Sequence, residues 1–127
     1  MALLIPATDL PGHERLASAP LVVLALCADW CGTCRDFRPV LERIAASRPG
    51  ALFAWADIED DAGLVGDIDV EDFPCLAVYR KGAALHFGSA LPHEGVVARL
   101  LEALMERSDP ASGIPEAVRE LGTRLAR

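Results

Sequence analysis

Runs of apolar residues alternate with amphipathic stretches along this chain and predict its main strands and helices. Leu21–Cys27 is continuously apolar and rich in β-branched residues, which is typical of a strand buried on both faces, and Ala51–Ala56 is a second such run. From Cys31 onward, apolar residues recur at three- and four-residue steps and predict an amphipathic helix that ends near Pro49-Gly50. Pro39 should kink this helix, because proline supplies no backbone donor.

The second half of the chain has the pattern of a short helix, a hairpin and a longer helix. An acidic, glycine-punctuated connection suits a short helix around Ala62–Val65. Cys75–Arg80 and Ala84–Gly88 flank Lys81-Gly82, which predicts a hairpin turn between antiparallel strands. A further helix should begin near Pro92 and cover the sheet with one apolar stripe. The residues of this stripe are Val96, Val97, Leu100, Leu101, Leu104 and Met105.

The two ends of the chain have weaker patterns. At the N-terminus, we expect an edge strand at Leu3–Ile5 and a short helix that Asp9 caps and that runs through Ala17. At the C-terminus, a linker over residues 108–113 precedes a weakly amphipathic helix. One face of that helix carries Val118, Leu121 and Leu125.

Length, composition and charge narrow the kind of protein. A chain of 127 residues, 52% of them hydrophobic, predicts one domain over residues 1–107 and a C-terminal linker and helical extension over residues 108–127. The formal charge of -7 repels phosphate backbones and anionic lipid, so nucleic acid is an unsuitable partner. No apolar run reaches the roughly 18 residues that span a membrane, and Pro6 interrupts the first apolar run. We therefore expect a cytoplasmic protein without membrane contact.

Two of the four cysteines lie in the sequence Cys31-Gly32-Thr33-Cys34, where the buried strand ends and the helix begins. The first cysteine lies among unpaired backbone N–H groups at the positive end of the helix dipole, which lowers the pKa of its thiol. The second follows on the first turn, within reach of the first for a disulfide. Cys31 is therefore predicted to be the attacking nucleophile, and Cys34 the resolving thiol that releases the reduced substrate.

Metal binding is an alternative, because zinc sites use the same Cys-x-x-Cys spacing. A zinc site would need a second pair of ligands, but Cys27 and Cys75 are isolated in strands and the three histidines lack ligand spacing. All four sulfurs together could still bind an iron–sulfur or zinc centre. We expect no metal and interpret Cys27 and Cys75 as packing residues, since free cysteine is commonly buried. Auxiliary redox or regulatory thiols near the dithiol are the other interpretation of these two residues.

The segment Val22–Leu41, with Trp30-Cys31-Gly32-Thr33-Cys34 at its centre, resembles the active-site strand and helix of the thioredoxin family. The resemblance extends without an obvious gap over roughly Leu21–Leu104. It implies the thioredoxin fold, an α/β fold with a central mixed sheet of four or five strands and helices on both faces. It also implies that Pro74, after Phe73, occupies the position of the family's cis-proline.

The resemblance further implies a protein-disulfide reductase that works by thiol–disulfide exchange. Its only redox group would be the disulfide Cys31–Cys34, with no other cofactor. Protein disulfides would be the substrates and a thioredoxin-reductase-like protein the electron donor. An extended substrate chain would lie in a groove. The residues of that groove would be Trp30, Gly32, Thr33, Phe73, Pro74, Gly88 and Ser89, although Trp30 could instead serve as hydrophobic cover for the dithiol.

One departure from the family pattern has a chemical consequence. Many thioredoxins have a buried acid in the active-site strand and a lysine on the neighbouring strand, but this chain has Ala25 and Trp55 there. Cys34 therefore lacks the usual internal proton acceptor, which leaves water or Asp29 to take its proton. The missing acid and the C-terminal extension favour an alternative function, a thioredoxin-like binding module or assembly chaperone with slow or vestigial redox turnover.

Overall fold

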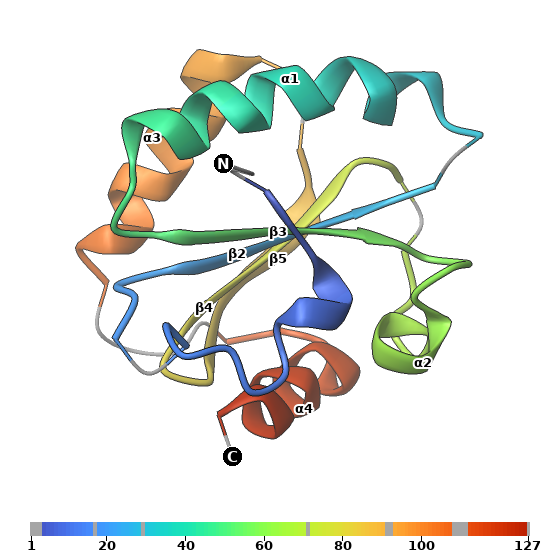
Figure 1. Ribbon diagram of the computed structural model, residues 1–127, viewed down its shortest axis with the longest axis vertical. Coiled ribbons are helices and arrows are strands. Elements are labelled where there is room, and N and C mark those ends of the chain that lie inside the picture. The colour runs from blue at the N-terminus through green and yellow to red at the C-terminus, as the bar shows by residue number, and fades with distance from the viewer. Residues whose placement is uncertain are drawn as a thin grey trace.

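A five-stranded mixed sheet forms the centre of the molecule, in the strand order β1-β3-β2-β4-β5 (Figure 1). The computed structural model describes residues 4–16, 18–28, 30–70, 72–90, 93–107 and 112–126. β2 is the central strand, parallel to β3 and antiparallel to β4, as its apolar sequence predicts. The strands are β1 (Ile5–Pro6), β2 (Val22–Cys27), β3 (Leu52–Asp57), β4 (Cys75–Arg80) and β5 (Ala83–Ser89).

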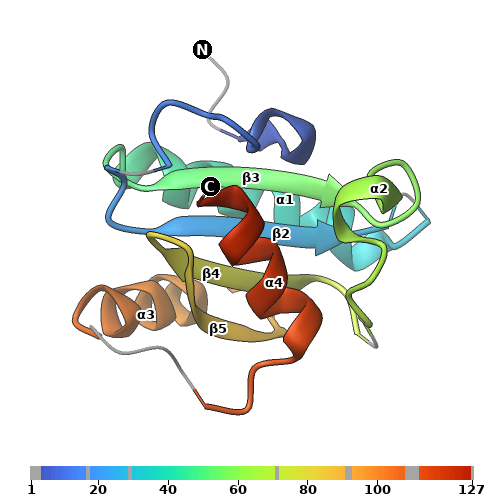
Figure 2. The ribbon, with the colours of Figure 1, turned by 90° about the horizontal axis from the view of Figure 1, so that it is seen from below.

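Helices cover both faces of this sheet, which confirms the expected fold class. α1 and α3 lie on one face, whereas the 3-10 helix η1, α2 and α4 lie on the other (Figures 1 and 2). None of the helices in the described ranges is long and apolar enough to cross a membrane. The helices are η1 (Ala7–Asp9), α1 (Gly32–Ser47), α2 (Ala62–Val65), α3 (Glu94–Met105) and α4 (Glu116–Leu125).

Two apolar clusters fill the spaces between the sheet and its helices. Side chains alternate between the faces along a strand, so β2 contributes to both clusters. Val23 and Ala25 pack with residues of α1 and α3, whereas Val22, Leu24 and Leu26 pack with residues of η1, α2 and α4. Every residue of β2 is buried. The strand is thus buried on both faces, as the sequence predicts.

The predicted hairpin and long helix are confirmed. Lys81 and Gly82 connect β4 to β5 with positive φ angles of 50° and 85°, the backbone conformation that suits two-residue hairpins. α1 ends at Ser47, shortly before the predicted stop, and Pro39 lies inside it. The predicted apolar face of α1 is buried: Phe37, Val40, Leu41, Ile44 and Ala45.

The predicted helix near the N-terminus is wrong. Asp9 is the last residue of η1 and does not cap a helix, and residues 11–16 form turns apart from one position. Gly12 has a φ of 76°, a left-handed conformation that glycine adopts readily and that interrupts a helix. The edge strand is present as Ile5–Pro6 and pairs in parallel with β3. Leu3 and Ala17, which the prediction included, lie outside the described residues.

The apolar stripe of α3 is narrower than predicted. Val97, Leu101 and Leu104 are buried, but Val96 and Met105 remain 48% and 41% exposed. Only one side of this helix meets the sheet and α1, so apolar residues at the margin of the stripe stay in contact with solvent. Pro92, the predicted first residue, lies outside the described residues.

The C-terminal helix α4 lies across the sheet face opposite α1 (Figure 2). The predicted apolar residues of α4 are buried in the same cluster as the side chains of β2 and β4 that point to this face of the sheet. The Tyr79 hydroxyl of β4 donates a hydrogen bond to the Val118 carbonyl of α4 at 2.8 Å. At the end of α4, Gly122 and Ala126 lie so close to Gly82 that an added Cβ on Gly82 would meet the Ala126 Cβ at 2.6 Å. Whether residues 1–107 form a domain without α4 stays a prediction, and residues 108–111 lie outside the description.

Candidate active site

The turn between β2 and α1 holds Cys31 at the beginning of the helix. β2 ends at Cys27, and Cys31 is the N-cap residue of α1. The backbone N–H of Cys31 donates to the Ala28 carbonyl at 3.0 Å, which closes the turn. Cys31 therefore lies where the first N–H groups of the helix point outward, while Cys34 lies on the first turn.

The Cys31 thiol is half-buried, and hydrogen bonds favour its thiolate form. Burial alone would raise its pKa, but hydrogen bonds outweigh burial and lower the pKa of Cys31 from its ordinary value. The donors are the backbone N–H groups of Cys34 and Thr33, the Cys34 thiol and the Thr33 hydroxyl. This is the environment of a reactive cysteine.

The Cys34 thiol differs from Cys31 in both exposure and charge preference. It is 1% exposed, and burial raises the pKa of its thiol. Two donors oppose that rise, the Cys27 thiol and the backbone N–H of Ala28, both of which point at the Cys34 sulfur. None of the four cysteines forms a disulfide. The structure thus contains a dithiol with one accessible and one buried sulfur.

Cys27 lies beside Cys34, on the face of β2 that carries Ala25. Cys27 is 1% exposed, and burial is the main reason that the pKa of its thiol is raised. Next to the two sulfurs is a hollow of about 220 Å³. Its lining residues are Cys27, Ala28, Cys34, Arg35, Arg38 and Trp55.

Trp55 occupies the wall of this hollow. It is the register partner of Ala25 across β2 and β3. The Arg38 guanidinium lies over the Trp55 ring, 4.9 Å from the ring centroid, in the geometry of a cation–π contact. This stack of residues was not predicted, because it joins a helix to a strand distant in the sequence. The two positions where an acid and a lysine are usual therefore hold a methyl group and an indole.

Two aromatic residues lie next to the dithiol on the outer surface. Trp30 is 64% exposed, and its ring meets Phe73 edge to face at a centroid distance of 5.4 Å. The Trp30 Nε1 donates to the Glu59 Oε1 at 3.2 Å. The peptide bond Phe73–Pro74 is cis. Nothing in the sequence marked Glu59 as the residue that would hold the Trp30 ring.

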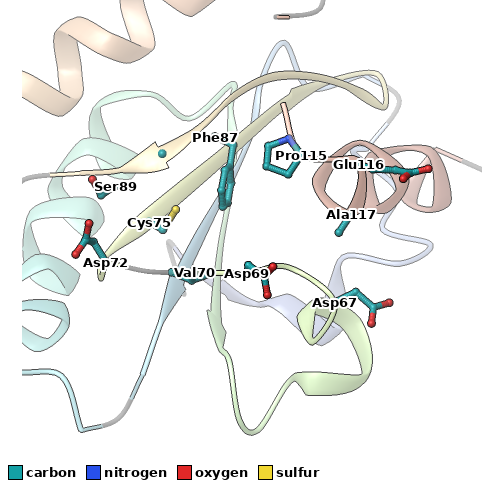
Figure 3. A pocket seen from close by; sticks show the side chains of 11 residues that line it. Asp67, Asp69, Val70, Asp72, Cys75, Phe87, Ser89, Pro115, Glu116 and Ala117 are labelled. Atoms are coloured by element: carbon teal, nitrogen blue, oxygen red, sulfur yellow. The ribbon is translucent and has the colours of Figure 1, made fainter. Parts of the chain in front are cut away.

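Cys75, Gly88 and Ser89 line a separate hollow of about 500 Å³ (Figure 3). Cys75 pairs with Leu26 in register, so both point to the face opposite Cys27. Burial raises the pKa of Cys75 to about 11. The wall formed by Pro115, Glu116 and Ala117 comes from the start of α4 and its preceding residue, which the sequence patterns could not place here. Other residues around the hollow are Asp67, Asp69, Val70, Asp72 and Phe87.

The structure therefore separates the sequence-predicted site residues into two groups. Gly32 and Thr33 are exposed at the start of α1, near Cys31 and Cys34. Trp30 and Phe73 contact each other, whereas Gly88 belongs to the second hollow with Cys75. Of the two auxiliary cysteines, only Cys27 contacts the dithiol. Asp29 lies outside the described residues, and within the described ranges no group of three or more potential ligands surrounds a common metal position.

Comparison with known proteins identifies the family of the chain. The thioredoxin family model matches residues 12–102. Protein disulfide-isomerase A4 from Bos taurus is 30% identical over 91 residues, which cover 68% of this chain and 14% of that protein. The chain thus spans about a seventh of that relative's length. Thioredoxin from Mus musculus is 29% identical over 92 residues, covering 71% of this chain and 88% of that protein.

Solved structures agree with the family on the fold. A mutant thioredoxin from Halobacterium salinarum NRC-1 superposes with a TM-score of 0.66 at 24% identity, over 84% of this chain and 91% of that one. Thioredoxin from Trypanosoma brucei brucei gives a TM-score of 0.62 at 24% identity, over 72% of this chain and 80% of that one. At these identities the structural likeness bears on the fold alone, and the family model covers well over half of the chain. The chain belongs to the thioredoxin family.

Proposed function

We propose that this protein is a protein-disulfide reductase in which Cys31 is the nucleophile and Cys34 the resolving thiol. The observation that carries the proposal is the contrast between the two sulfurs. Cys31 is half-exposed and accepts hydrogen bonds that lower its pKa, while Cys34 is buried directly behind it. Family membership supports the broader class, a thiol–disulfide oxidoreductase.

The proposed exchange with the substrate needs no cofactor beyond the two cysteines, with water as the proton acceptor. The Cys31 thiolate attacks one sulfur of a substrate disulfide, forms a mixed disulfide and releases the other substrate sulfur as a thiolate. Cys34 then gives its proton to water and attacks the Cys31 sulfur, so that the bond to the substrate breaks and the second substrate sulfur leaves as a thiolate. The substrate gains two electrons, and the protein is left with a Cys31–Cys34 disulfide. A thioredoxin-reductase-like donor would return the two electrons.

An extended segment of a protein substrate is the proposed ligand of the surface around Cys31. The exposed Trp30 contacts the half-buried Phe73 there, and Glu59 accepts a hydrogen bond that holds the Trp30 indole in place. Gly32 and Thr33 are exposed beside Cys31 at the start of α1. Proteins with the thioredoxin and protein disulfide-isomerase names among the relatives support protein disulfides as substrates. The cytoplasm belongs to the proposal, because a reductase works where thiols are kept reduced.

A disulfide-reduction assay with dithiothreitol as electron source tests the proposal. We expect the natural protein to accelerate reduction of a protein disulfide, and Cys31→Ser to abolish the acceleration because the three remaining thiols are buried. Cys75→Ala is a matched control, since it removes a buried cysteine on the opposite face of the sheet. Equal rates for the natural protein and Cys31→Ser would contradict the proposal.

The second candidate function is a binding module with slow redox turnover. Ala25 and Trp55 favour it, because neither residue can accept the proton that Cys34 must lose. Under this alternative, Trp30 and Phe73 would still bind an extended chain. Equal rates for the natural protein and Cys31→Ser in the assay above would make this the better account.

A further inference from the structure

The buried resolving thiol has a third thiol in contact with it, and the proposed mechanism gives that thiol no role. Cys27 and Cys34 are both 1% exposed and line the same small hollow. The Cys27 thiol donates a hydrogen bond to the Cys34 sulfur, and the Ala28 N–H donates a second one. A buried sulfur that loses its proton therefore finds two donors already directed at it.

The position of Cys27 on β2 explains this contact. Residues two apart on a strand point to the same face, so Cys27 shares its face with Ala25 and Val23, which pack with α1. Cys27 is one pleat nearer to the dithiol than Ala25. The chain thus lacks a polar group at Ala25 and has one at the next inward-facing position, against the first turn of α1.

We propose that Cys27 is a catalytic residue of the resolving step, in which its thiol donates a hydrogen bond to the Cys34 thiolate as that thiolate attacks the mixed disulfide. The inference rests on the proposed reductase function. It identifies what stabilises negative charge on Cys34 in a chain without the buried acid. A donor that is preorganised at the site of developing charge is an effective form of stabilisation.

The proton of Cys34 leaves through the hollow of about 220 Å³ beside the two sulfurs, which has room for water. Cys27 is not the proton acceptor, because burial raises its pKa far above neutrality. Among the described residues, the other charged groups around the two sulfurs are Arg35 and Arg38 at the hollow and Asp57 near Cys27.

The bonding of Cys34 changes when the substrate attaches. In the free dithiol, the Cys34 thiol donates to the Cys31 sulfur. Once Cys31 is part of a mixed disulfide, that acceptor has lost its charge, and the Cys34 proton passes to water. The Cys34 thiolate then forms a bond to the Cys31 sulfur, the bond from Cys31 to the substrate breaks, and Cys27 keeps its proton throughout.

Rapid-quench trapping of the mixed disulfide in Cys27→Ala and Cys27→Ser tests this inference. Cys27→Ala removes the donor, and loss of one hydrogen bond to a charged group should lengthen the lifetime of the mixed disulfide about tenfold. The pH profile of resolution should move upward by about one unit for the same reason. Cys27→Ser keeps a donor at this position, so its lifetime and pH profile should stay close to those of the natural protein. The rate of Cys31 alkylation reports the reactivity of the thiol that performs the first step of exchange. This rate should be unchanged in both variants.

A second measurement separates this inference from the proposed function. In the Cys31→Ser background, which cannot turn over, the Cβ chemical shift of isotope-labelled Cys34 reports its titration directly. Adding Cys27→Ala should raise the pH at which Cys34 titrates, and adding Cys27→Ser should not. A natural protein that reduces no disulfide would defeat the reductase proposal, while the titration still decides the role of Cys27. Unchanged titration in Cys27→Ala, or equal slowing in both Cys27 variants, would overturn the inference.

Discussion

Three cysteines lie close together in the sequence where β2 is followed by α1. Their thiols differ in chemistry because each cysteine occupies a different place in its strand or helix. Cys31 begins a helix, Cys34 lies on the inner side of its first turn, and Cys27 ends a buried strand. The spacing of Cys31 and Cys34 predicted their roles. The contact between Cys27 and Cys34 depends on how α1 packs on β2, which spacing does not contain. The alternation of side chains along the strand is the sequence signal that places Cys27 on the same face as Ala25.

The Cys31 thiol should be the first to react with iodoacetamide at neutral pH. Its lowered pKa and its partial exposure both favour attack, whereas burial raises the pKa values of Cys34 and Cys27. The rate at Cys31 should rise with pH and reach half of its maximum below the ordinary cysteine value of 9.0. Mass mapping after brief labelling at several pH values measures both effects. Faster labelling of Cys34 would reverse the assignment of nucleophile and resolving thiol.

Ala25→Asp should accelerate resolution of the mixed disulfide and destabilise the fold. Ala25 is 0% exposed, so the new carboxyl would lie in the apolar layer below Cys34, where it could accept a proton. Burying a polar group without full hydrogen bonding costs about 1–3 kcal/mol. Burial also raises the pKa of the carboxyl in the folded state above the unfolded value near 4. Stability is therefore lost as pH rises above about 4, and the cost is larger at neutral pH than in acid.

Denaturant unfolding at acidic and neutral pH, together with rapid-quench lifetimes, measures the two effects of Ala25→Asp. Ala25→Asn is the matched control, because it buries a polar group of similar size that does not titrate. Equal lifetimes in the natural protein and Ala25→Asp would show that proton removal from Cys34 does not depend on this position.

At the scale of elements, regular sequence patterns were sufficient to predict the strands and helices, whereas irregular patterns were not. The central strand, the first long helix, the short helix and the hairpin follow from local periodicity and turn residues. The N-terminal helix failed because Pro11 and Gly12 turn the chain, and a cap signal at Asp9 does not outweigh them. The place of α4 could not be predicted, because an apolar face says that a helix packs but not on which side of the sheet.

Tyr79→Phe should weaken the attachment of α4 by about 1 kcal/mol at neutral pH, the worth of one buried hydrogen bond. The lost bond is the one from the Tyr79 hydroxyl to the Val118 carbonyl, 2.8 Å long. Burial raises the pKa of Tyr79 in the folded state. The unfolded chain therefore ionises first, and this tyrosine's stabilising contribution falls as pH rises above about 10.

Denaturant unfolding at neutral and alkaline pH should show the deficit of Tyr79→Phe shrinking as pH rises. Tyr79 is the chain's single tyrosine, so phenolate absorbance in the natural protein reports this group alone. A deficit that stays constant above about pH 10 would contradict a buried neutral hydroxyl.

Gly122→Ala should loosen α4 even though alanine is the better helix former. A Cβ at position 122 would lie 2.5 Å from the Gly82 carbonyl oxygen and 2.7 Å from the Tyr79 ring. Forced overpacking costs about 1–3 kcal/mol and exceeds the gain of about 1 kcal/mol in helix propensity. Gly63→Ala in α2 is the control, because a Cβ there meets nothing within 4 Å. Thermal melting of both variants compares them, and a stabilised Gly122→Ala would show that α4 can shift freely.

Across the whole molecule, two faces of one sheet serve different purposes. α1 and α3 cover the face of Cys27 and Cys34, while α4 completes the cover of the other face together with η1 and α2 (Figures 1 and 2). The sequence predicted the dithiol and the two helices of the first face, but not the contacts that Cys27 and Trp55 make beside the dithiol. The sequence patterns indicated that residues 108–127 extend a domain that is already complete. In the structure, the apolar side chains of α4 belong to the main core.

Removal of residues 108–127 should destabilise the entire domain. Val118, Leu121 and Leu125 are buried, and burial of three such side chains contributes about 5 kcal/mol, as an upper estimate. This is comparable with the total stability of many domains, about 5–15 kcal/mol. Denaturant unfolding and binding of a hydrophobic dye would measure the loss. Unchanged stability and dye binding in residues 1–107 would show that these residues form a complete domain, as the sequence patterns suggested.

The meeting of Ala126 with Gly82 determines how this molecule could be attached to a surface. Gly82 lies in the turn after β4, and β4 runs antiparallel to β2, so this turn is at the end of the sheet away from Cys31. Strands of six residues separate the two ends by about 20 Å. A bead, an electrode or a fluorescent reporter joined after α4 would therefore be held at the end of the sheet away from Cys31. The immobilised protein would present its dithiol outward, open to disulfides in solution.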